Sequence, residues 1–169
     1  MNQGRIIVIT GAPGTGKSAA SESIAQKSDM EKSVHMYTDD FYHFISKGAI
    51  APHLPESSEQ NLIVIEAFLE AAKRYARGGY DVIVDGIIGP WFLKPWLDIV
   101  QEGYEVHYII LRANKEETMK RAINCVKLDK ETNIELVESM WKQNQNKFSF
   151  LFVSCLQRKH CKSRKAVLL

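Results

Sequence analysis

The stretch that decides the fold is Arg5-Ile6-Ile7-Val8-Ile9-Thr10, followed directly by Gly11-Ala12-Pro13-Gly14-Thr15-Gly16-Lys17-Ser18. The apolar run is typical of a buried strand in a parallel sheet. The second part matches the pattern G-x-x-x-x-G-K-[ST], the phosphate loop, which lies between a strand and a helix. The alternative, an ordinary glycine-rich turn, would bind no phosphate. The strand before the loop and the helical pattern after it favour a nucleotide-phosphate site.

Each residue type in this loop has a physical role. Glycines let the backbone approach a phosphate closely, and successive N–H groups then form a nest for an anion. The helix that follows adds its positive end to the same point. Lys17 supplies a charge for the outer phosphates, and Ser18 offers a hydroxyl ligand for Mg²⁺. We therefore expect residues 11–18, together with Ala19, to hold ATP and Mg²⁺.

The composition describes an ordinary globular chain of 169 residues, 45% of them hydrophobic and 25% charged. This length predicts a single domain over residues 1–169. The net charge of +2 argues against a general attraction to nucleic acid or to a membrane surface. No apolar run approaches the ~20 residues of a membrane span, and no signal-peptide layout is present. The three cysteines lack C-x-x-C spacing, which favours reduced thiols in a cytoplasmic protein.

Strand and helix patterns alternate along the chain, which predicts an α/β fold with helices on both faces of a parallel sheet. Strands are expected at 34–38, 80–86 and 105–111, with a fifth at 148–153. Helices are expected after the loop, at about 58–77, near 96–102, and on either side of residue 127. Capping boxes are predicted from the pairs Ser57 and Gln60, Asn114 and Glu117, and Thr132 and Glu135.

Two parts of this pattern carry further expectations. Helical spacing places one apolar face on the long helix, made of Leu62, Ile65, Phe68, Leu69, Ala72 and Tyr75. Residues 146–169 form an atypical C-terminal end that includes the basic run 158–165. A partly disordered, solvated tail is the simplest interpretation of that run, and a nucleic-acid contact is the alternative.

Carboxylates follow two of the predicted strands. Asp85 ends the third strand, where ligands bind in open α/β sheets, and is placed to hold Mg²⁺; a turn-capping role is the alternative. Asp39 and Asp40 end the second strand at a helix start. One of them can orient and deprotonate an acceptor hydroxyl while the other caps the helix. In a purely structural alternative, both serve as caps.

Cations and aromatic residues complete the predicted site. Arg121 is the preferred candidate for stabilising the transferred phosphoryl charge, with Lys127 second and Arg112 undecided between the site and an ion pair. Loop residues on the acceptor side suit a small-molecule pocket. Among these the expected substrate contacts are Asp40, Tyr42, His43, Gly86 and Trp91, with His53, Phe92 and Trp96 in the same segments.

The chain resembles small P-loop kinases of the group that includes chloramphenicol phosphotransferase, gluconate kinase and shikimate kinase, whose members are often labelled AAA-type ATPases. The residues that carry this resemblance are Gly11–Ser18, Asp39-Asp40-Phe41-Tyr42 and Val82-Ile83-Val84-Asp85-Gly86. It implies a parallel five-stranded sheet in the order 2-3-1-4-5, ATP and Mg²⁺ at the loop, and a lid between the last helices. The D-x-F-Y stretch also resembles uridine and nicotinamide riboside kinases, which favours Asp39 over Asp40 as the base.

Together these residues predict an ATP-dependent phosphotransferase acting on a hydroxyl of a small molecule. An ATPase or nucleotide switch without an acceptor is the first alternative. A GTPase is disfavoured because no N/T-K-x-D stretch is present. The second alternative is a nucleotide-binding protein without activity, whose basic tail contacts nucleic acid. The identity of the acceptor does not follow from the sequence.

Overall fold

The computed structural model describes residues 3–89, 92–124, 130–145 and 153–155. The strands are β1 (Ile6–Gly11), β2 (Ser33–Tyr37), β3 (Asp81–Asp85), β4 (Val106–Leu111) and β5 (Val153–Cys155). The helices are α1 (Lys17–Gln26), α2 (Thr38–His43), α3 (Ser58–Arg77), α4 (Lys94–Gln101), α5 (Lys115–Ile123) and α6 (Lys130–Gln145), with a short 3₁₀ turn at Pro55–Ser57. No described helix combines the length and apolar composition needed to cross a bilayer.

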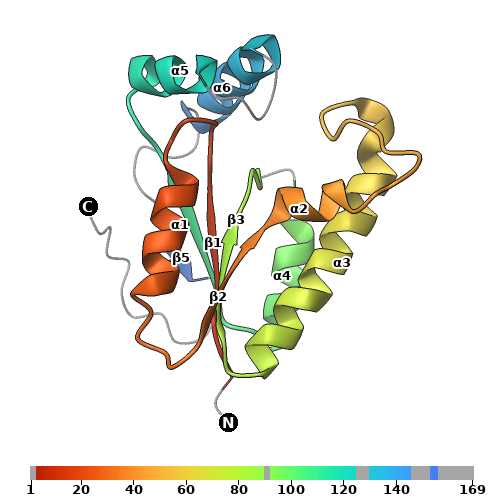
Figure 1. Cartoon of the computed structure of the whole chain (residues 1–169), viewed down its shortest axis with the longest axis vertical. Helices are drawn as coiled ribbons and strands as arrows, with labels where there is room; N and C mark the ends of the chain where they lie inside the picture. The colour runs from red at the N-terminus through yellow and green to blue at the C-terminus, as the bar shows by residue number, and fades with distance from the viewer. Residues whose placement is uncertain (1–2, 90–91, 125–129, 146–152, 156–169) are drawn as a thin grey trace.

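The sheet has the order β2-β3-β1-β4-β5, with the phosphate-loop strand in the middle. Strands β1 to β4 pair in parallel, so their carboxyl ends meet at one edge. Figure 1 shows α1 on one face of the sheet, α3 and α4 on the other, and α5 and α6 beyond the carboxyl ends. The predicted α/β/α class and strand order are confirmed.

The main core lies between the sheet and the α3–α4 layer. The buried strand residues there include Ile6, Val8 and Val84, and the largest buried side chains that meet them are Phe68 and Trp96. Their burial contributes roughly 1.5–3 kcal/mol for each large apolar side chain. Packing in this core fixes the position of the strands relative to α3 and α4, and therefore the position of the site at the carboxyl ends of the strands.

The fifth strand differs from the prediction. It pairs antiparallel to β4, with Tyr108 opposite Ser154, and comprises residues 153–155. The expected strand 148–153 falls mostly outside the described residues, as does the basic run 158–165. A short apolar run carries no information about its direction, so the sequence pattern could not distinguish the two pairings.

The capping predictions had mixed outcomes. Asn114 Oδ1 accepts a hydrogen bond from the Glu116 amide at 2.9 Å and caps α5, although Glu117 pairs with Arg121 instead of completing a box. The Thr132 box is wrong, because α6 begins two residues earlier, at Lys130. The Ser57 box is also wrong: the Ser57 hydroxyl bonds the carbonyls of Pro52 and Leu54 in the preceding loop. The polar pair at the start of α3 therefore holds the loop rather than the helix end.

The predicted core face of α3 is largely confirmed. Ile65, Phe68, Leu69 and Ala72 are buried, but Leu62 and Tyr75 are 43% and 40% exposed because they lie at the edge of this face.

A partly buried ion pair joins Arg5, the residue before β1, to the first residue of β3 at the end of the sheet opposite the phosphate loop. Arg5 donates to both carboxylate oxygens of Asp81, at 2.9 and 2.6 Å, and the Ser28 hydroxyl donates to the same carboxylate at 2.6 Å. Burial raises the pKa of Asp81, but the hydrogen bonds from Arg5 and Ser28 outweigh it, so the net shift is downward. The carboxylate is therefore bound in its charged form.

We expect Asp81→Asn to lower the free energy of unfolding by about 1.5–3 kcal/mol, because the buried side chain would lose its charge-assisted hydrogen bonds from Arg5. Since the pKa of Asp81 is depressed by folding, this contribution is present above the unfolded pKa of about 3.9 and is lost as the pH falls through the folded value. Urea unfolding at pH 7 and pH 3 measures both effects.

The matched control for this prediction is Asp29→Asn, because Asp29 also pairs with Arg5 but is 79% exposed. Its replacement should destabilise the chain much less than Asp81→Asn does, because solvent screens an exposed ion pair. Equal losses for the two variants, or a difference that does not shrink at pH 3, contradict the prediction.

Candidate functional site

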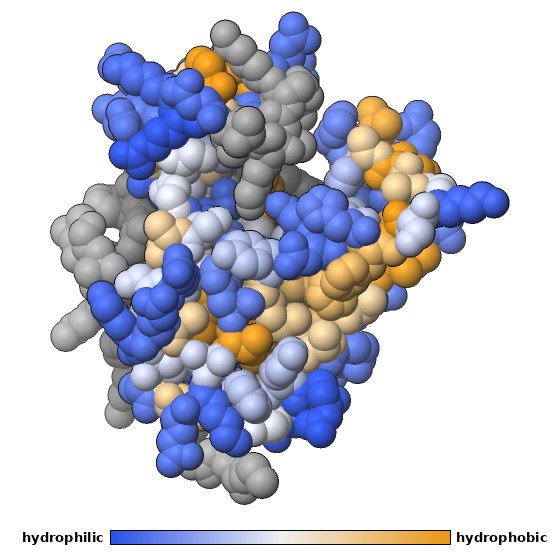
Figure 2. All heavy atoms as spheres, viewed as in Figure 1, coloured by the Kyte–Doolittle hydropathy of each residue, from blue (hydrophilic) through white to orange (hydrophobic). Residues whose placement is uncertain are grey.

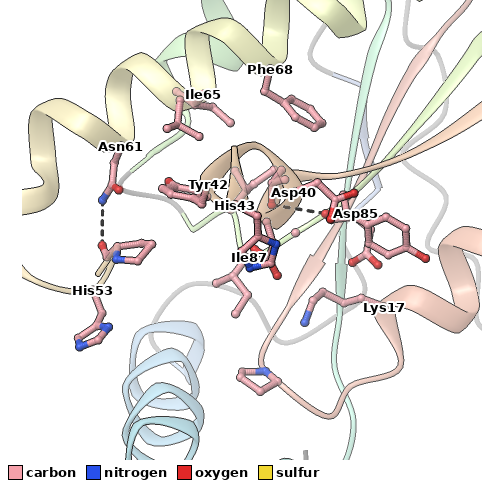
Figure 3. Close-up of a pocket in the computed structure, with 18 of the residues that line it drawn as sticks. Lys17, Asp40, Tyr42, His43, His53, Asn61, Ile65, Phe68, Asp85 and Ile87 are labelled. Atoms are coloured by element: carbon pink, nitrogen blue, oxygen red, sulfur yellow. Dashed lines mark hydrogen bonds between the residues drawn. The ribbon is translucent and has the colours of Figure 1, made fainter. Parts of the chain in front are cut away.

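A cavity of about 910 Å³ opens at the carboxyl ends of β1, β2 and β3. The phosphate loop and the start of α1 form one side, and α2, the loop at 49–53 and the first turns of α3 form the other. Figure 3 shows Lys17 and Asp85 at one end of this pocket and Asn61 with His53 at the far end. The described residues thus surround one elongated site with two chemically different ends.

The phosphate loop has the backbone that its glycines predict. Gly14 and Gly16 have φ values of 79° and 88°, in the left-handed region that favours glycine, and Gly16 is the N-cap residue of α1. The amide and hydroxyl of Thr15 both donate to the Ala12 carbonyl, at 3.3 and 2.8 Å. Lys17 Nζ donates to the same carbonyl at 3.2 Å, which holds the ammonium group across the loop.

The predicted nucleotide residues divide into two groups. Those that line the pocket are Pro13, Gly14, Gly16, Lys17, Ser18 and Ala19. Gly11, Ala12 and Thr15 are not part of the lining. Gly11 and Ala12 are buried, and a Cβ on Gly11 would lie 2.4 Å from the Leu111 carbonyl oxygen. Gly11 therefore permits β1 and β4 to stay paired where the loop begins, and it supports the phosphate site from below.

Helix α5 packs directly on this loop. A Cβ on Gly14 would lie 2.8 Å from the Thr118 carbonyl oxygen and 3.0 Å from the Ala122 amide. Ala12, Ala122 and Val137 form a second small core here that joins α5 and α6 to the loop. The two helices are thereby held over the phosphate end of the site.

The predicted cations lie near the site but outside the described lining. Arg121 is on α5 beside Gly14, yet its side chain is 54% exposed and its Nε donates to Glu117 at 2.7 Å. The guanidinium of Arg112 lies over the Trp141 ring, 5.1 Å from its centroid. Lys127 is outside the described residues. The Arg121–Glu117 pair has the four-residue spacing that favours ion pairs on a helix, whereas the contact of Arg112 with Trp141 joins segments far apart in the sequence.

Asp85 lies at the carboxyl end of β3 and is 4% exposed. Its Oδ2 atom is buried without a hydrogen-bond partner among the described residues, and the nearest basic atom, His35 Nε2, is 3.7 Å away. A buried, unsatisfied carboxylate oxygen is costly unless something else binds it. Asp85 and Ser18 line the same pocket, and they are the donor set that could hold Mg²⁺ there.

This donor set agrees with what Mg²⁺ requires in phosphoryl transfer. The described part of the chain contains no group of three His, Cys, Asp or Glu side chains that could form a protein-only metal cage. Mg²⁺ typically binds one or two carboxylates and completes its coordination with substrate phosphates and water.

Asp39 and Asp40 occupy the first turn of α2, which starts where β2 ends. Both side chains are exposed to the pocket that they line. No side-chain hydrogen bond caps this helix, whose N-cap residue is Tyr37, so the structure does not support a capping role for either acid. β2 lies next to β3, with Tyr37 opposite Asp85, and this pairing brings the acids of the two strand ends to one site.

The acceptor-side predictions also had mixed outcomes. Tyr42, His43, His53, Phe92 and Gly86 line the pocket. Trp96 does not: it is fully buried in the main core, with its ring 6.4 Å from that of Phe68. Trp91 lies outside the described residues. Burial, and then the charge of Asp39, raise the pKa of Tyr42, so its hydroxyl stays protonated near neutral pH.

Gly86 is required by packing next to α2. A Cβ there would lie 2.1 Å from Thr38 Oγ1, a hydroxyl that bonds the Asp85 carbonyl at 3.4 Å. We expect Gly86→Ala to displace α2, and with it Asp39, and to lower phosphate transfer by at least about 10²-fold, as misplacement of about 1 Å does. Steady-state turnover is the measurement. Adding Thr38→Ala should restore part of the activity, and no loss in the single variant would contradict the prediction.

Several lining residues were not predicted as site residues. Asn61, Val64, Ile65 and Phe68 reach the pocket from α3, and Ile87 and Ile88 reach it from the segment after β3. Figure 2 shows apolar side chains gathered over α3 and the loop before it. Helical periodicity identified Ile65 and Phe68, but only as core. It could not separate a core position from a cavity wall, because both are apolar and lie on the same face.

Comparison with known proteins agrees with this geometry. A family model described as an AAA domain matches residues 7–144. No curated protein sequence is significantly similar to the chain.

Solved structures with the same fold include several P-loop kinases. A chain of the Pnkp1/Rnl/Hen1 RNA repair complex matches with 20% identity and a TM-score of 0.63, over 96% of this chain and 52% of that one. The tunicamycin resistance protein of Deinococcus radiodurans matches with 17% identity and a TM-score of 0.59, over 86% of this chain and 82% of that one. A sugar kinase from Janibacter sp. matches with 17% identity and a TM-score of 0.58, over 82% of this chain and 76% of that one. This chain therefore spans about half the length of the RNA repair protein.

Proposed function

This chain belongs to the AAA-domain family, and on that premise we propose that it is an ATP-dependent phosphotransferase whose acceptor is a hydroxyl of a small molecule. One observation supports this most strongly. The phosphate loop with Lys17, the exposed carboxylate of Asp39 and the buried carboxylate of Asp85 line the same pocket. These are the parts that phosphoryl transfer to an alcohol requires: a phosphate cradle, a base that orients the nucleophile, and a metal ligand.

In this proposal each residue has a distinct role. The loop amides and Lys17 bind and orient the β- and γ-phosphates. Ser18 with Asp85 would hold Mg²⁺, which would supply positive charge to the phosphates. Asp39 accepts the proton of the acceptor hydroxyl and directs its oxygen toward the γ-phosphorus. Arg121 stabilises the transferred charge after it exchanges Glu117 for the phosphoryl oxygens. The cytoplasmic location and the single-domain organisation remain predictions from the sequence.

The main competing function is ATP hydrolysis without an acceptor. The pocket favours transfer, because it extends well past the phosphate loop to α3 and the 49–53 loop, space that a hydrolase would not need. A hydroxyl of RNA is a second class of acceptor, suggested by the RNA repair complex with the same fold. The experiment is ADP formation from ATP and Mg²⁺ across a panel of hydroxyl compounds. A rise with one class of acceptor supports the proposal, and the same rate with every compound contradicts it.

A further inference from the structure

The two ends of the pocket differ in charge. Among the described lining residues Lys17 is the only lysine or arginine, and it lies in the phosphate loop. Three carboxylates, those of Asp39, Asp40 and Asp85, line the same cavity, and the other basic side chains are the exposed His43 and His53. An anionic acceptor would enter beside Asp39 and Asp40 with no lysine or arginine of the described lining to compensate it. Like charges placed together in this way cost several kcal/mol.

The wall of the acceptor end is mostly apolar. Val64, Ile65 and Phe68 on α3 are at most 7% exposed and reach the cavity from one side, and Ile88 and Phe92 contribute from the segment after β3. Figure 3 shows Ile65 and Phe68 pointing from α3 toward the space beside Tyr42 and His43. Such a wall favours binding of the apolar part of an acceptor, because water is removed from both surfaces. An ionised group would lose its hydration there without gaining a hydrogen bond or an opposite charge.

Asn61 supplies one specific polar contact at this end. Its Nδ2 donates to the Pro52 carbonyl and to Ser57 Oγ, both at 2.8 Å. Because a carbonyl can only accept, and because the Ser57 hydroxyl proton is directed to loop carbonyls, both contacts require N–H donors. The orientation of the amide is therefore fixed.

The fixed amide leaves its oxygen unsatisfied. Asn61 Oδ1 is buried and has no hydrogen-bond partner among the residues that the structure describes, although Asn61 lines the cavity. A buried carbonyl-type oxygen without a partner costs roughly 1–3 kcal/mol, a cost that a donor on a bound molecule would remove. The neighbouring Gln60 differs, because its oxygen and nitrogen are both satisfied by the backbone of Ile50, at 2.8 and 2.7 Å.

From these three observations we infer that the acceptor is an uncharged alcohol with an apolar body, and that Asn61 Oδ1 selects it by accepting a hydrogen bond from an O–H or N–H group on that body. The inference rests on the proposed function for the identity of the reacting hydroxyl. Acceptors that carry a phosphate or carboxylate, including nucleic-acid ends, would find no lysine or arginine at this end among the described lining residues. Asn61 is a specificity-determining residue here and takes no part in the transfer step.

Matched pairs of probes test the charge preference. One pair is 1-phenyl-1,2-ethanediol and mandelate, which share a phenyl body and differ in a hydroxymethyl or carboxylate group. The other is thymidine and thymidine 3′-monophosphate, a minimal stand-in for a nucleic-acid 5′ end. Binding is measured by titration calorimetry with Mg²⁺ and a non-hydrolysable ATP analogue. We expect the neutral member of each pair to bind at least about tenfold more tightly.

Paired variants test the role of Asn61. Asn61→Leu should weaken binding of thymidine by about 5- to 10-fold, the value of one hydrogen bond to a neutral ligand. Gln60→Leu is the control, because Gln60 also holds the 49–53 loop but has no unsatisfied atom; it should change binding by less than about 2-fold. A melting-temperature scan of each variant detects any loss of folding.

The possible outcomes separate this inference from the proposed function. Tighter binding of either anionic probe, equal binding within the pairs, or no binding of the neutral probes contradicts the inference. Equal losses in Asn61→Leu and Gln60→Leu contradict the role of Asn61. Because the nucleotide analogue cannot be cleaved, these measurements do not depend on catalysis. A failure of the transfer chemistry would appear instead as a rate of ADP formation that is the same with every acceptor.

Discussion

Replacing Asp39 with asparagine is expected to lower the kcat of acceptor phosphorylation by about 10²- to 10⁴-fold, the usual contribution of a general base. The amide keeps the shape of the side chain but cannot take up the proton of the acceptor hydroxyl. Affinity for ATP should change by less than about 3-fold, because Asp39 lies on α2 and the nucleotide phosphates are held by the loop. Initial rates with saturating ATP, together with a nucleotide titration, measure the two effects separately.

Asp40→Asn is the matched control for this prediction. Asp40 follows Asp39 in the same helical turn, is exposed, and lines the same pocket. Consecutive residues of a helix point in directions about 100° apart, so only one of the two carboxylates can be aligned with the acceptor oxygen. We expect a loss of less than about 10-fold for Asp40→Asn. A larger loss for Asp40 would exchange their roles, and full activity in both variants would contradict base catalysis from α2.

Replacing Lys17 with alanine should have the other large effect. Lys17 is held across the loop through the Ala12 carbonyl, and its ammonium group can turn from that weak neutral acceptor to charged phosphate oxygens. A hydrogen bond to a charged group contributes about 1.5–3 kcal/mol, so ATP affinity should fall by about 10- to 100-fold. The transition state would also lose the stabilising charge of the lysine, which should lower kcat by a further factor of about 10².

Binding of a fluorescent ATP analogue and steady-state turnover test the Lys17 prediction. Lys27→Ala is a suitable control, since Lys27 is an exposed residue at the other end of α1 and outside the pocket. It should bind and turn over ATP as the unmodified chain does. Wild-type ATP affinity in Lys17→Ala would show that the loop amides alone hold the nucleotide, and would contradict the role given to the lysine.

The parts of the site that the sequence could predict are those fixed by local spacing. The loop motif predicts the backbone conformation of residues 11–18 and identifies Lys17 and Ser18 as site residues. Asp39 and Asp85 follow strands, and the carboxyl ends of parallel strands meet at one edge, so their proximity follows once the strand order is known. That order came from the resemblance to P-loop kinases rather than from periodicity, and the structure confirms it.

The parts that could not be predicted depend on long-range packing. The path of residues 44–57 has no periodicity, so nothing in the sequence indicated that Gln60 and Asn61 would hold this loop. Gln60 was instead predicted to form a helix cap with Ser57. Arg121 follows a lid pattern, but its ion pair with Glu117 is also favoured at a spacing of four residues. Trp96 has the flanking prolines of a pocket loop, yet it completes the core beneath α3.

Transfer of phosphate from ATP labelled at the γ-position tests the central claim most directly. The chain is incubated with labelled ATP, Mg²⁺ and the neutral and anionic hydroxyl compounds, and the products are separated into inorganic phosphate and phosphorylated acceptor. We predict that the label appears on a hydroxyl of the acceptor and that Asp39→Asn prevents this while ATP still binds. Label recovered only as inorganic phosphate, at a rate that no acceptor changes, would contradict the account and identify a hydrolase.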